Sequence, residues 1–580
     1  MHRLQRFILS SGQLKPRYCT QVPVRHFTES FRAMAAKEYK LKGVTSLALS
    51  LGDKQEVEVE GVENGKVVLL NAAGKVQAVG AKCTHYGAPM AKGVLTKSGY
   101  LRCPWHGACF NAKTGDVEDA PALDALPVFD VAERDGAVYI TGEESAIKSS
   151  RRSPNFKCSA APGGAQEDPI VVVGGGSGAL GAVEGLREKG YKGALTVISN
   201  EGYLPIDRPK LSKALISDTS KIAWRDKAWF EAGGVQWVEG EVTAVNFSER
   251  NVETKSGGKI AYSKLILATG GTPRRLPLEG FKTLSNIFTL RNAHDVKKIV
   301  DTIGSKGKNI VIVGSSFIGM EVAVATAADN SVSVIGMESV PLERVLGKDV
   351  GAGVQKIVQG KGVKFYNSAS VDKAVPSESD PSAVGAVLLK DGTRLDADLV
   401  ILGVGVAPST EYLKENSSVQ LEKDGSIKVD QHFSVVGQQG VYAIGDIATY
   451  PYHGPGGEGK PVRIEHWNVA QNAGRAAATH IVGPSVETSQ FIPVFWSALG
   501  SQLRYCGNTA NGWDDLVLDG SPGDAKFVAY YTKGDTVVAM ASMGRDPLMV
   551  QSAELMRFGN MPTKANLQAN LDLMSVGVPA

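Results

Sequence analysis

The sequence predicts a multidomain protein, with a small all-β domain followed by an α/β region built around two nucleotide-binding units. Three observations support this fold class. The chain has 580 residues, enough for about four domains of roughly 150 residues. Short valine-rich runs between residues 57 and 79 are broken by glycine and asparagine, a pattern typical of paired strands. Apolar runs at 169–173 and 309–313 each lead into a glycine-rich loop and a helix-like segment, as in parallel α/β units.

Composition and charge exclude several classes of protein. Hydrophobic residues make up 43% and charged residues 21% of the chain, which is ordinary for a globular protein. The sequence has no run of 18 or more apolar residues, so we expect no membrane-spanning helix. Six cysteines are too few for a disulfide scaffold of this length. Beyond residue 37 there are 56 basic and 59 acidic residues, and this mildly acidic balance argues against general nucleic-acid binding.

Residues 1–37 have a composition unlike the rest of the chain. They contain seven basic residues and a single acid, Glu29, and their start places Leu4, Phe7 and Ile8 among arginines. An arginine-rich, serine-containing and acid-poor N-terminus is typical of a mitochondrial presequence, so we expect a mitochondrial protein. A disordered basic tail is the alternative, and translation from Met34 would give a cytoplasmic product without this segment.

The expected first domain, residues 38–142, carries two short cysteine–histidine motifs. Cys83 and His85 form one, Cys103 and His106 form the other, and 17 residues separate them. Zinc modules usually pair two cysteines in one loop and two histidines in another. Here each loop contributes one thiolate and one imidazole, which suits an asymmetric two-iron cluster with imidazoles on one iron and thiolates on the other. A zinc site is the alternative.

The segments around these motifs, CTHYGAPMAKG and CPWHGACFNAKTGDVEDAPA, resemble the Rieske [2Fe–2S] pattern. The resemblance implies that both cysteines and both histidines bind the cluster. Respiratory Rieske proteins join their two loops by a disulfide, but this chain has Ala88 and Trp105 at those places, so it is similar to the ferredoxin type. We expect His85 and His106 to be the ligands nearest to solvent and the exit for electrons, and Cys109 to be a buried apolar residue.

Residues 143–168 are predicted to form a linker, because they lack apolar periodicity and are rich in serine, proline, glycine and charge. A flexible coil of this length would span about 28 Å. That reach would allow the first domain to move across the face of the next one.

Directly after the linker, an apolar run leads into a G-x-G-x-x-A loop that contains Gly174, Gly176 and Ala179. Gly174 allows a tight turn, Gly176 lets a pyrophosphate approach the helix N-terminus, and Ala179 keeps helix and strand close. Glu201 follows the second apolar run of this unit, where an acid can bind an adenosine ribose hydroxyl. Alone, such a glycine loop is a weak signal.

A second loop of the same kind contains Gly314, Ser316 and Gly319. Two such units in one chain suggest two dinucleotides, FAD and a nicotinamide cofactor. Glu338 lies two residues beyond the place where an acid often follows the second strand, and it could still reach the ribose 2′-hydroxyl. Arg344 is the first arginine after it, so no arginine is expected near a 2′-phosphate and NADH is favoured over NADPH.

Further motifs resemble those of the apoptosis-inducing factor and ferredoxin reductase flavoprotein family. They are LPIDRPKLSK at 204–213, LILATG at 265–270, GME at 319–321, VYAIGD at 441–446, RIEHWN at 463–468 and IPVFWS at 492–497. With the cluster motifs in front, nearly all of residues 38–580 resembles the Rieske-bearing branch of this family. Disulfide reductases of the same fold are excluded, since no cysteine lies between Cys158 and Cys506.

The resemblance implies a domain order beyond the linker. FAD-binding segments would occupy 169–300 and 431–490, with a NAD-binding domain between them at 301–430. Residues 491–580 would form an α+β reductase or dimerisation-type domain, which makes a homodimer a candidate assembly.

The resemblance also assigns roles to individual residues. Lys213 and Glu321 fall on a lysine–glutamate pair beside the reactive edge of the flavin; a surface ion pair of little energetic value is the alternative. Arg208 would hold FAD, while Glu465 and His466 would line the nicotinamide side. Further contacts to the flavin cofactor are expected from Thr269, Gly270, Asp446 and Trp467.

Two roles are open for the tryptophans near the expected flavin site. Trp467 and Trp496 either stack near the flavin or fill the core. His294, His432 and His453 have no motif around them and are expected to be structural or exposed.

The sequence thus predicts an NAD(P)H-dependent oxidoreductase that passes electrons from NADH through FAD to its own [2Fe–2S] cluster and on to an unknown acceptor. The alternative is a redox-gated cell-death or signalling protein in which NADH binding controls dimerisation or partner binding. A subunit of an assimilatory reductase is a third hypothesis, but it needs a siroheme-type cysteine set that the sequence lacks.

Overall fold

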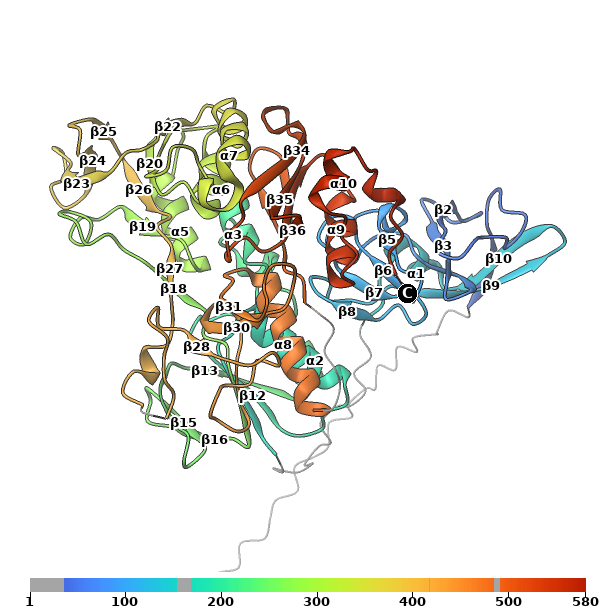
Figure 1. Cartoon of the computed structure of the whole chain (residues 1–580). Helices are drawn as coiled ribbons and strands as arrows, with labels where there is room; N and C mark the ends of the chain where they lie inside the picture. Colours follow the sequence, from blue (N-terminus) through green and yellow to red (C-terminus); the bar gives the residue numbers. More distant parts are fainter. Residues whose placement is uncertain (1–35, 154–167, 417, 485–490, 580) are drawn as a thin grey trace, which may run out of the picture.

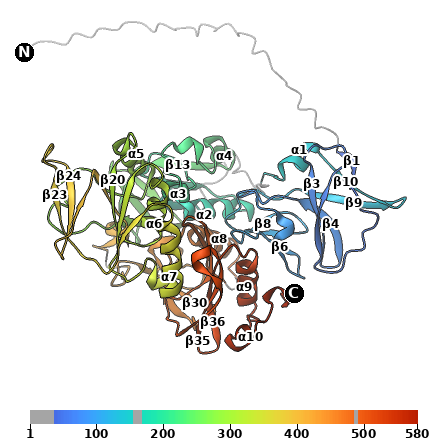
Figure 2. The ribbon, with the colours of Figure 1, turned by 90° about the horizontal axis from the view of Figure 1, so that it is seen from above.

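The computed structural model describes residues 36–153, 168–416, 418–484 and 491–579. The predicted presequence lies almost entirely outside these residues. The first domain packs against both the C-terminal domain and the first α/β part, and the second α/β part lies farthest from it (Figures 1 and 2). Among the described residues, no helix has the length and apolar character needed to cross a bilayer.

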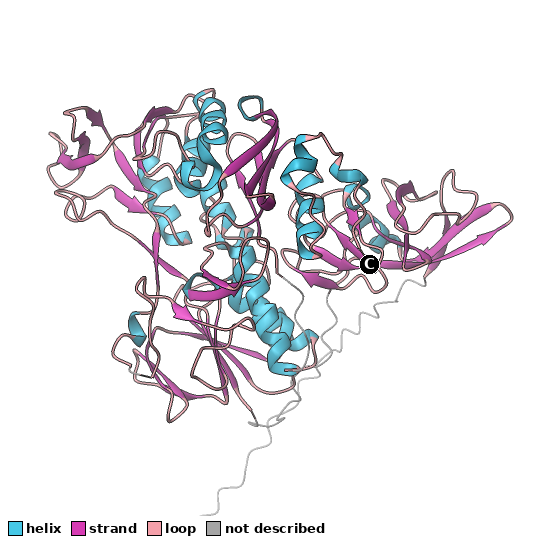
Figure 3. Cartoon of the chain, viewed as in Figure 1, coloured by secondary structure: helices cyan, strands magenta, loops and turns pink. Residues whose placement is uncertain are grey.

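The first domain is built almost wholly from strands, as Figure 3 shows, and the predicted all-β class is confirmed. Its larger sheet has the order β1-β10-β9-β4-β3-β2 and its smaller sheet the order β5-β6-β7-β8. The first cysteine–histidine loop connects β4 of the larger sheet to β5 of the smaller one, and the second connects β6 to β7. The strands are β1 (Lys37–Lys40), β2 (Lys54–Glu58), β3 (Lys66–Ala72), β4 (Lys75–Gly80), β5 (Val94–Leu95), β6 (Tyr100–Arg102), β7 (Cys109–Asn111), β8 (Val117–Asp119), β9 (Val128–Arg134) and β10 (Ala137–Gly142).

The start of the predicted linker is part of the first domain. Residues 144–149 form helix α1 (Glu144–Ser149), and its Ile147 is buried in the core of the larger sheet. Arg152 then pairs with Ala125 in an isolated β-bridge. The boundary at residue 143 is therefore wrong, because one buried isoleucine in a polar segment gives no periodic signal. Residues 154–167 of the expected linker lie outside the described residues.

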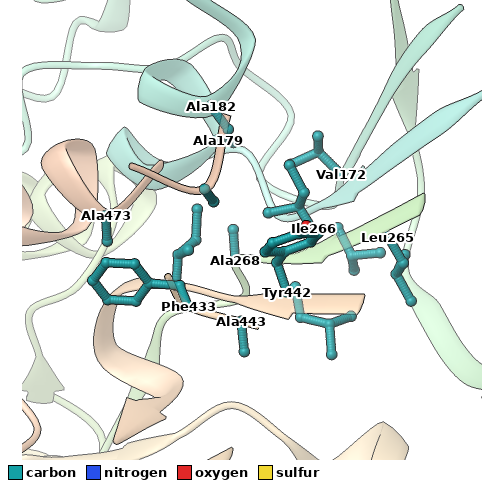
Figure 4. Packing of buried hydrophobic residues seen from close by; sticks show 14 of the residues in the cluster. Val172, Ala179, Ala182, Leu265, Ile266, Ala268, Phe433, Tyr442, Ala443 and Ala473 are labelled. Carbon is teal, nitrogen blue, oxygen red and sulfur yellow. The ribbon is translucent and has the colours of Figure 1, made fainter. Parts of the chain in front are cut away.

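The FAD-type domain contains a parallel sheet of order β13-β12-β11-β17-β29, whose apolar side chains pack together in Figure 4. Helices α2 (Ser177–Glu188) and α8 (Trp467–Val482) cross closely on one face of it. A Cβ atom at Gly181 would lie 2.2 Å from the Gln471 carbonyl oxygen, so this contact requires glycine. The strands are β11 (Ile170–Val173), β12 (Leu195–Ser199), β13 (Val235–Glu239), β17 (Lys264–Leu267) and β29 (Val441–Ala443).

The NAD-type domain has a second parallel sheet of order β19-β26-β20-β21-β22. Both glycine loops follow the carboxyl ends of the first strands of their units, so the ends of the two sheets supply the nucleotide sites. The elements are β19 (Ile287–Thr289), α5 (Ala293–Ile303), β20 (Asn309–Val313), α6 (Phe317–Thr326), β21 (Ser331–Ile335), α7 (Glu343–Gln359), β22 (Lys364–Tyr366) and β26 (Leu399–Leu402).

The structure shifts both predicted limits of this domain. Strand β19 lies before residue 301 but pairs with β26 of the NAD-type sheet. At the other limit, Leu413, Val419 and Ile427 lie before residue 431 but pack in the core of the FAD-type domain. Crossings between two domains of the same architecture leave no change in composition, so motif positions could not place them.

The C-terminal domain is an antiparallel sheet of order β32-β33-β36-β35-β34 covered by helix α9, and its α+β class is confirmed. Its elements are β32 (Val494–Ala498), β33 (Gln502–Gly507), β34 (Asp515–Ser521), β35 (Lys526–Lys533), β36 (Thr536–Met543), α9 (Leu548–Arg557) and α10 (Lys564–Gln568). The remaining elements of the two α/β domains are α3 (Pro209–Lys213), α4 (Lys227–Ala232), β14 (Val242–Asn246), β15 (Asn251–Thr254), β16 (Lys259–Ala261), β18 (Gly271–Pro273), β23 (Val371–Pro376), β24 (Val384–Leu389), β25 (Arg394–Asp396), β27 (Val406–Pro408), β28 (Ile427–Lys428), β30 (Ala448–Tyr452) and β31 (Lys460–Val462).

Candidate functional site

A cavity of about 940 Å³, the central cavity, lies where the two α/β domains meet the C-terminal domain. This volume is at the upper end of the range for small-molecule and cofactor sites. Its walls include most of the predicted nucleotide-binding residues: Gly174, Gly176, Glu201, Arg208, Lys213, Thr269, Gly270, Glu321, Asp446, Glu465, His466 and Trp467.

The glycine loop at one end of the cavity is shaped for close approach by a ligand. Gly174 has a φ of 113°, and a Cβ atom there would lie 2.2 Å from the Ala268 carbonyl oxygen. Gly176 forms the N-cap of α2, and Ala179 is buried one turn later against the sheet. Backbone amides of the first turn of α2 therefore point into the cavity, as a pyrophosphate site requires.

Charged side chains that pair with one another also line this end of the cavity. The guanidinium of Arg208 donates to both carboxylate oxygens of Glu201, at 2.9 and 2.7 Å. Asp446 accepts from Arg291 at 2.7 Å, beside Gly270. The hydroxyl of Thr269 is turned toward the Ser409 carbonyl oxygen at 2.7 Å. The carboxylates of Glu201 and Asp446 thus each have a cationic partner before any ligand binds.

Arg291 and His294 are among the cavity residues that the sequence analysis did not place there. Both lie after β19 and line the cavity. His294 has its Nε2 atom 3.0 Å from the Glu201 carbonyl oxygen, so its expected structural or exposed role is incomplete. No motif surrounds either residue, and only the placement of β19 in the second sheet brings them to the cavity.

Lys213 and Glu321 meet inside the cavity, with Nζ and Oε1 2.9 Å apart. The glutamate also accepts hydrogen bonds from the hydroxyls of Ser212 and Ser497, each at 2.5 Å. Its side chain is only 5% exposed. The alternative of a surface ion pair is therefore wrong, because this carboxylate is held by three donors away from solvent.

The second glycine loop lies in the NAD-type domain, and the predicted residues Gly314, Ser316, Gly319 and Glu338 are not among those that line the central cavity. Gly314 and Gly319 approach each other so closely that a Cβ at Gly319 would lie 2.1 Å from the Gly314 carbonyl oxygen. Ser316 is the N-cap of α6, and its hydroxyl donates to the Gly403 carbonyl oxygen at 3.2 Å. Phe317 and Ile318, which follow it, line the cavity.

Glu338 has an arginine neighbour that the sequence analysis did not expect. The Arg344 Nε atom lies 2.8 Å from its carboxylate, so the expectation that no arginine stands nearby is wrong. The chain turns through Leu342, which has a φ of 61°, and α7 then brings Arg344 back beside β21.

Glu465 and His466 lie on the wall toward the C-terminal domain. Arg463 donates to Glu465 at 2.6 Å. Burial, with a smaller effect from the Lys213 ammonium, lowers the pKa of His466 to about 3. The neutral His466 accepts a hydrogen bond from the Asn468 amide through Nδ1 and so caps α8.

The two cysteine–histidine loops fold alike. The amide of Cys83 donates to Ala88 and that of Cys103 to Ala108, each at 2.8 Å. The Nδ1 atoms of His85 and His106 lie 3.1 Å apart, and the two cysteine thiols are within hydrogen-bonding reach of each other. Metal–imidazole bonds of roughly 2.0–2.1 Å place two nitrogens of one tetrahedral ion about 3.4 Å apart. One metal ion can therefore join both imidazoles.

The donor set fits a two-iron cluster better than a single zinc ion. A structural zinc ion takes four ligands at one point, but no group of three or more His, Cys, Asp or Glu side chains within the described residues could hold one ion. A Rieske cluster needs only one pair of protein ligands on each iron. Burial lowers the pKa of His85 to about 3, which keeps the imidazole in the neutral form that binds metals. Cys109 is buried, as expected, and is a free cysteine.

All four cluster ligands are buried, and the histidines face the reductase. The His106 ring lies 4.1 Å from that of Trp496, centroid to centroid, and the His85 ring lies 5.6 to 6.0 Å from Trp224, Trp467 and Trp496. The histidines, predicted to be the ligands nearest to solvent, are only 7% and 3% exposed, against 3% and 1% for the cysteines, and their predicted role as the electron exit stays a prediction. The docking of the first domain, which no local motif encodes, turns them toward the central cavity.

Trp467 and Trp496 also line the central cavity. Their rings lie 5.7 Å apart in an edge-to-face arrangement. Both tryptophan side chains therefore lie in the cavity wall, between the nucleotide site and the cluster ligands, and not only in the core.

Buried ion pairs hold the first domain in this position. Arg225 of the FAD-type domain bonds Asp124 at 2.6 Å and Glu184 at 3.0 Å, and the side chains are 10%, 8% and 1% exposed. At the C-terminal domain, Arg102 pairs with Glu554 at 2.5 Å. We call these contacts the docking interface.

The docking interface has a pH dependence that we expect to be measurable. Burial raises the pKa of Glu184 from 4.5 to about 7, although the Arg225 guanidinium opposes the change. Between pH 4.5 and 7 the folded protein then binds more protons here than the unfolded chain, so stability falls as pH rises. The fall in the Tm of thermal unfolding over this window should be smaller in Glu184→Gln than in the wild type. Glu241→Gln, an exposed control, should behave as the wild type; equal slopes in all three proteins would contradict the assignment.

Comparisons with known proteins agree with this architecture. Residues 38–130 match the family model of the Rieske [2Fe-2S] domain, residues 168–474 that of pyridine nucleotide-disulphide oxidoreductases, and residues 494–576 that of the reductase C-terminal domain. Human apoptosis-inducing factor 3 is 36% identical over 96% of this chain and 92% of that protein. Putidaredoxin reductase from Pseudomonas putida is 30% identical, with 69% of this chain and 94% of that protein covered.

Solved structures point the same way. A chain from the crystal structure of the covalent putidaredoxin reductase–putidaredoxin complex superposes with a TM-score of 0.65 at 28% identity, covering 70% of this chain and 97% of that chain. The ferredoxin reductase of the CYP199A2 system from Rhodopseudomonas palustris also gives a TM-score of 0.65, at 25% identity, covering 71% of this chain and 100% of that chain.

Proposed function

The chain belongs to the pyridine nucleotide-disulphide oxidoreductase family, and from that premise we propose that it carries electrons from NADH through FAD to its own Rieske cluster and on to an external acceptor. It is an NAD(P)H-dependent flavoprotein oxidoreductase that resembles ferredoxin reductases and carries a Rieske [2Fe–2S] domain. FAD, the cluster and NADH are its cofactors. The internal route between them is our proposal.

One observation carries the proposal: Trp496 lines the central cavity and also contacts His106. A flavin accepts two electrons as hydride from the nicotinamide and can return them singly to a one-electron centre. The tryptophan fills the space through which those electrons would pass. Because the docking interface holds the first domain against the cavity, no diffusional encounter is needed.

The residues around the cavity have separate tasks in this proposal. Gly174, Gly176 and the α2 N-terminus bind the FAD pyrophosphate, while Arg208, Asp446 and Arg291 position its sugar and phosphate region. Gly314, Ser316 and Gly319 bind the nicotinamide cofactor. Ser212 and Ser497 hold Glu321, which in turn fixes the Lys213 ammonium.

An anaerobic titration with NADH tests the proposal. The purified protein with FAD and cluster is titrated while flavin absorbance and the EPR spectrum are recorded. A Rieske-type EPR signal that grows as the flavin bleaches is the expected result. Bleaching without a cluster signal would sink the internal route. Slow turnover with every acceptor, together with NADH-induced dimerisation, would instead favour the redox-gated signalling function.

Lys213 is expected to matter for flavin reduction rather than for binding. An ammonium beside the flavin stabilises negative charge on the reduced ring. Lys213→Met should slow NADH reduction of the flavin by roughly 10²-fold, the effect of removing one preorganised charge, and should lower the flavin midpoint potential. Stopped-flow absorbance and a redox titration measure the two effects. Lys213→Arg keeps the charge and should retain most of the rate; equal losses in both variants would contradict an electrostatic role.

Glu338 is expected to set the preference for NADH. Its carboxylate occupies the Arg344 guanidinium and repels a 2′-phosphate. Glu338→Ala should therefore shift the ratio of kcat/KM for NADH over NADPH toward NADPH by roughly 10–100-fold, the worth of one hydrogen bond to a charged group. Adding Arg344→Leu should remove the gain for NADPH. A ratio unchanged in Glu338→Ala would place the ribose elsewhere.

The cellular location and the partners of the protein are also proposals. The composition of residues 1–37 supports import into mitochondria, and initiation at Met34 would leave the product in the cytoplasm. Nicotinamide nucleotide is one partner by virtue of the fold. The external electron acceptor and a homodimer are the remaining candidates.

A further inference from the structure

The cluster ligands are shielded on the reductase side, so electrons that reach them need a different way out. The rings of Trp224, Trp467 and Trp496 surround His85 on that side. On another side the Tyr86 ring stacks on His85, with centroids 3.8 Å apart and an angle of 17° between the planes. Tyr86 is 37% exposed, whereas His85 beneath it is 7% exposed. Tyr86 therefore joins a cluster ligand to the surface through one ring contact.

A second aromatic residue is a weaker candidate for this path. Trp105 lies in the other ligand loop, and its ring is 6.3 Å from that of His106 at an angle of 71°. It is also less exposed than Tyr86. The closer, parallel contact favours the path through Tyr86.

Around Tyr86, the cationic side chains are exposed and the carboxylates that pair with them are buried. Lys210 places its ammonium 5.5 Å from the centre of the Tyr86 ring, and its side chain is 38% exposed. Its partner Asp207, which accepts a hydrogen bond from the Tyr86 hydroxyl, is 2% exposed. The same division occurs next to it, where Arg151 is 53% exposed and its partner Asp124 is 8% exposed.

These cations are tied to the cluster loop itself. Arg151 donates to the carbonyl oxygen of Thr84, between the ligand Cys83 and His85. Lys82 is exposed at the start of the same loop. The carboxylates point inward, so the solvent side of Tyr86 is bordered by positive charge. We call Lys82, Tyr86, Arg151 and Lys210 the exit patch.

We propose that electrons leave the cluster through Tyr86 to an acidic one-electron carrier protein that docks on the exit patch. The inference rests on the proposed function, because it takes the cluster to be reduced from within. A positive surface steers a negatively charged protein to productive encounter. An exposed aromatic ring at the centre of the patch gives that protein a packed contact with the cluster ligand.

The electron balance is simple. Each docking event moves one electron from the reduced cluster to the carrier, with no bond made or broken and no charge stored on Tyr86. One NADH supplies two electrons and becomes NAD⁺ with release of one proton. Two molecules of carrier are therefore reduced for each NADH consumed.

The test uses two protein acceptors that share a haem but differ in charge: native cytochrome c, which is basic, and succinylated cytochrome c, which is acidic. The protein is reduced with NADH and mixed with either acceptor in a stopped-flow instrument at low ionic strength. The variants are Lys210→Glu, Tyr86→Leu, Tyr86→Phe and Trp105→Leu. Lys364→Glu, an exposed change on β22 far along the chain in the NAD-type sheet, is the control for net charge. A Cys83→Ser protein measures any direct transfer from the flavin, which is subtracted.

The proposal makes a distinct demand on each variant. Lys210→Glu should slow reduction of succinylated cytochrome c by about tenfold and speed reduction of the native form, and both effects should fade as salt shortens the Debye length to about 3 Å at 1 M. Lys364→Glu should change neither rate. Tyr86→Leu should slow both acceptors, while Tyr86→Phe, which keeps the ring, should not.

Other outcomes would overturn the proposal. Losses confined to Trp105→Leu would move the exit to the second ligand loop. Rates that do not depend on acceptor concentration or on Lys210 would mean that undocking of the first domain controls the transfer. Failure of the proposed function gives a different result, because NADH would then leave the wild-type cluster oxidised. In that case the cluster is reduced with dithionite, and the exit is still tested with the same acceptors.

Discussion

Cys83→Ser is expected to abolish reduction of the cluster by NADH while reduction of the flavin continues. Cys83 is 3% exposed and lies beside Cys103, so its loss leaves one iron with a single thiolate. Serine oxygen is a poor substitute for a soft thiolate ligand. The flavin site shares none of its wall residues with the cluster loops. We therefore expect no Rieske EPR signal, together with flavin bleaching at a rate close to that of the wild type.

Cys109→Ala is the matched control for this experiment. Cys109 is as buried as the ligands and lies on β7 of the same sheet, but it is not part of either ligand loop. Its EPR signal should persist with an unchanged line shape. Loss of flavin reduction in Cys83→Ser, in a protein that still binds FAD, would show that the two modules cannot be separated.

Arg225→Leu is expected to destabilise the docked first domain by about 3–5 kcal/mol, the usual cost of leaving a buried charge without its partner. Glu184, 1% exposed, loses its ion pair, and Asp124 keeps its ion pair with the exposed Arg151. Chemical denaturation followed by cluster absorbance measures the loss. Transfer from flavin to cluster should slow in the same variant, since the histidines are no longer pressed against Trp496.

Two further variants make this prediction specific. Arg394→Leu removes an arginine from an ion pair whose partners are 49% and 73% exposed, and it should change stability by less than about 1 kcal/mol. The double variant Arg225→Leu, Glu184→Leu should be more stable than Arg225→Leu alone, because no unpaired carboxylate is then buried. A double variant that is weaker than the single one would mean that packing, not charge, governs the docking interface.

The parts of this site that could be predicted are those encoded by short segments. The two ligand loops and the two glycine loops each depend on residues fewer than ten positions apart, and the spacing of these residues indicates which ligand they bind. Lys213 and Glu321 are 108 positions apart, and spacing alone could not pair them; the pairing came from the resemblance to relatives. The same resemblance predicted the C-terminal domain.

The remainder depends on how domains pack, and no local pattern encodes that. Arg291 and His294 reach the cavity because β19 crosses from one sheet to the other. His85 and His106 face the cavity because the first domain is docked, and one contact that holds it is the ion pair of Arg225, an arginine of another domain without any motif. Arg344 reaches Glu338 only because the chain reverses at Leu342.

The burial of the cluster histidines has a consequence for biogenesis. Iron and sulfide cannot reach His85 and His106 once Trp467 and Trp496 cover them, so the cluster has to be inserted before the first domain docks. A chain whose first domain docks before the cluster is inserted would be folded and flavin-bound but would lack its cluster. Insertion would then require the docking interface to reopen.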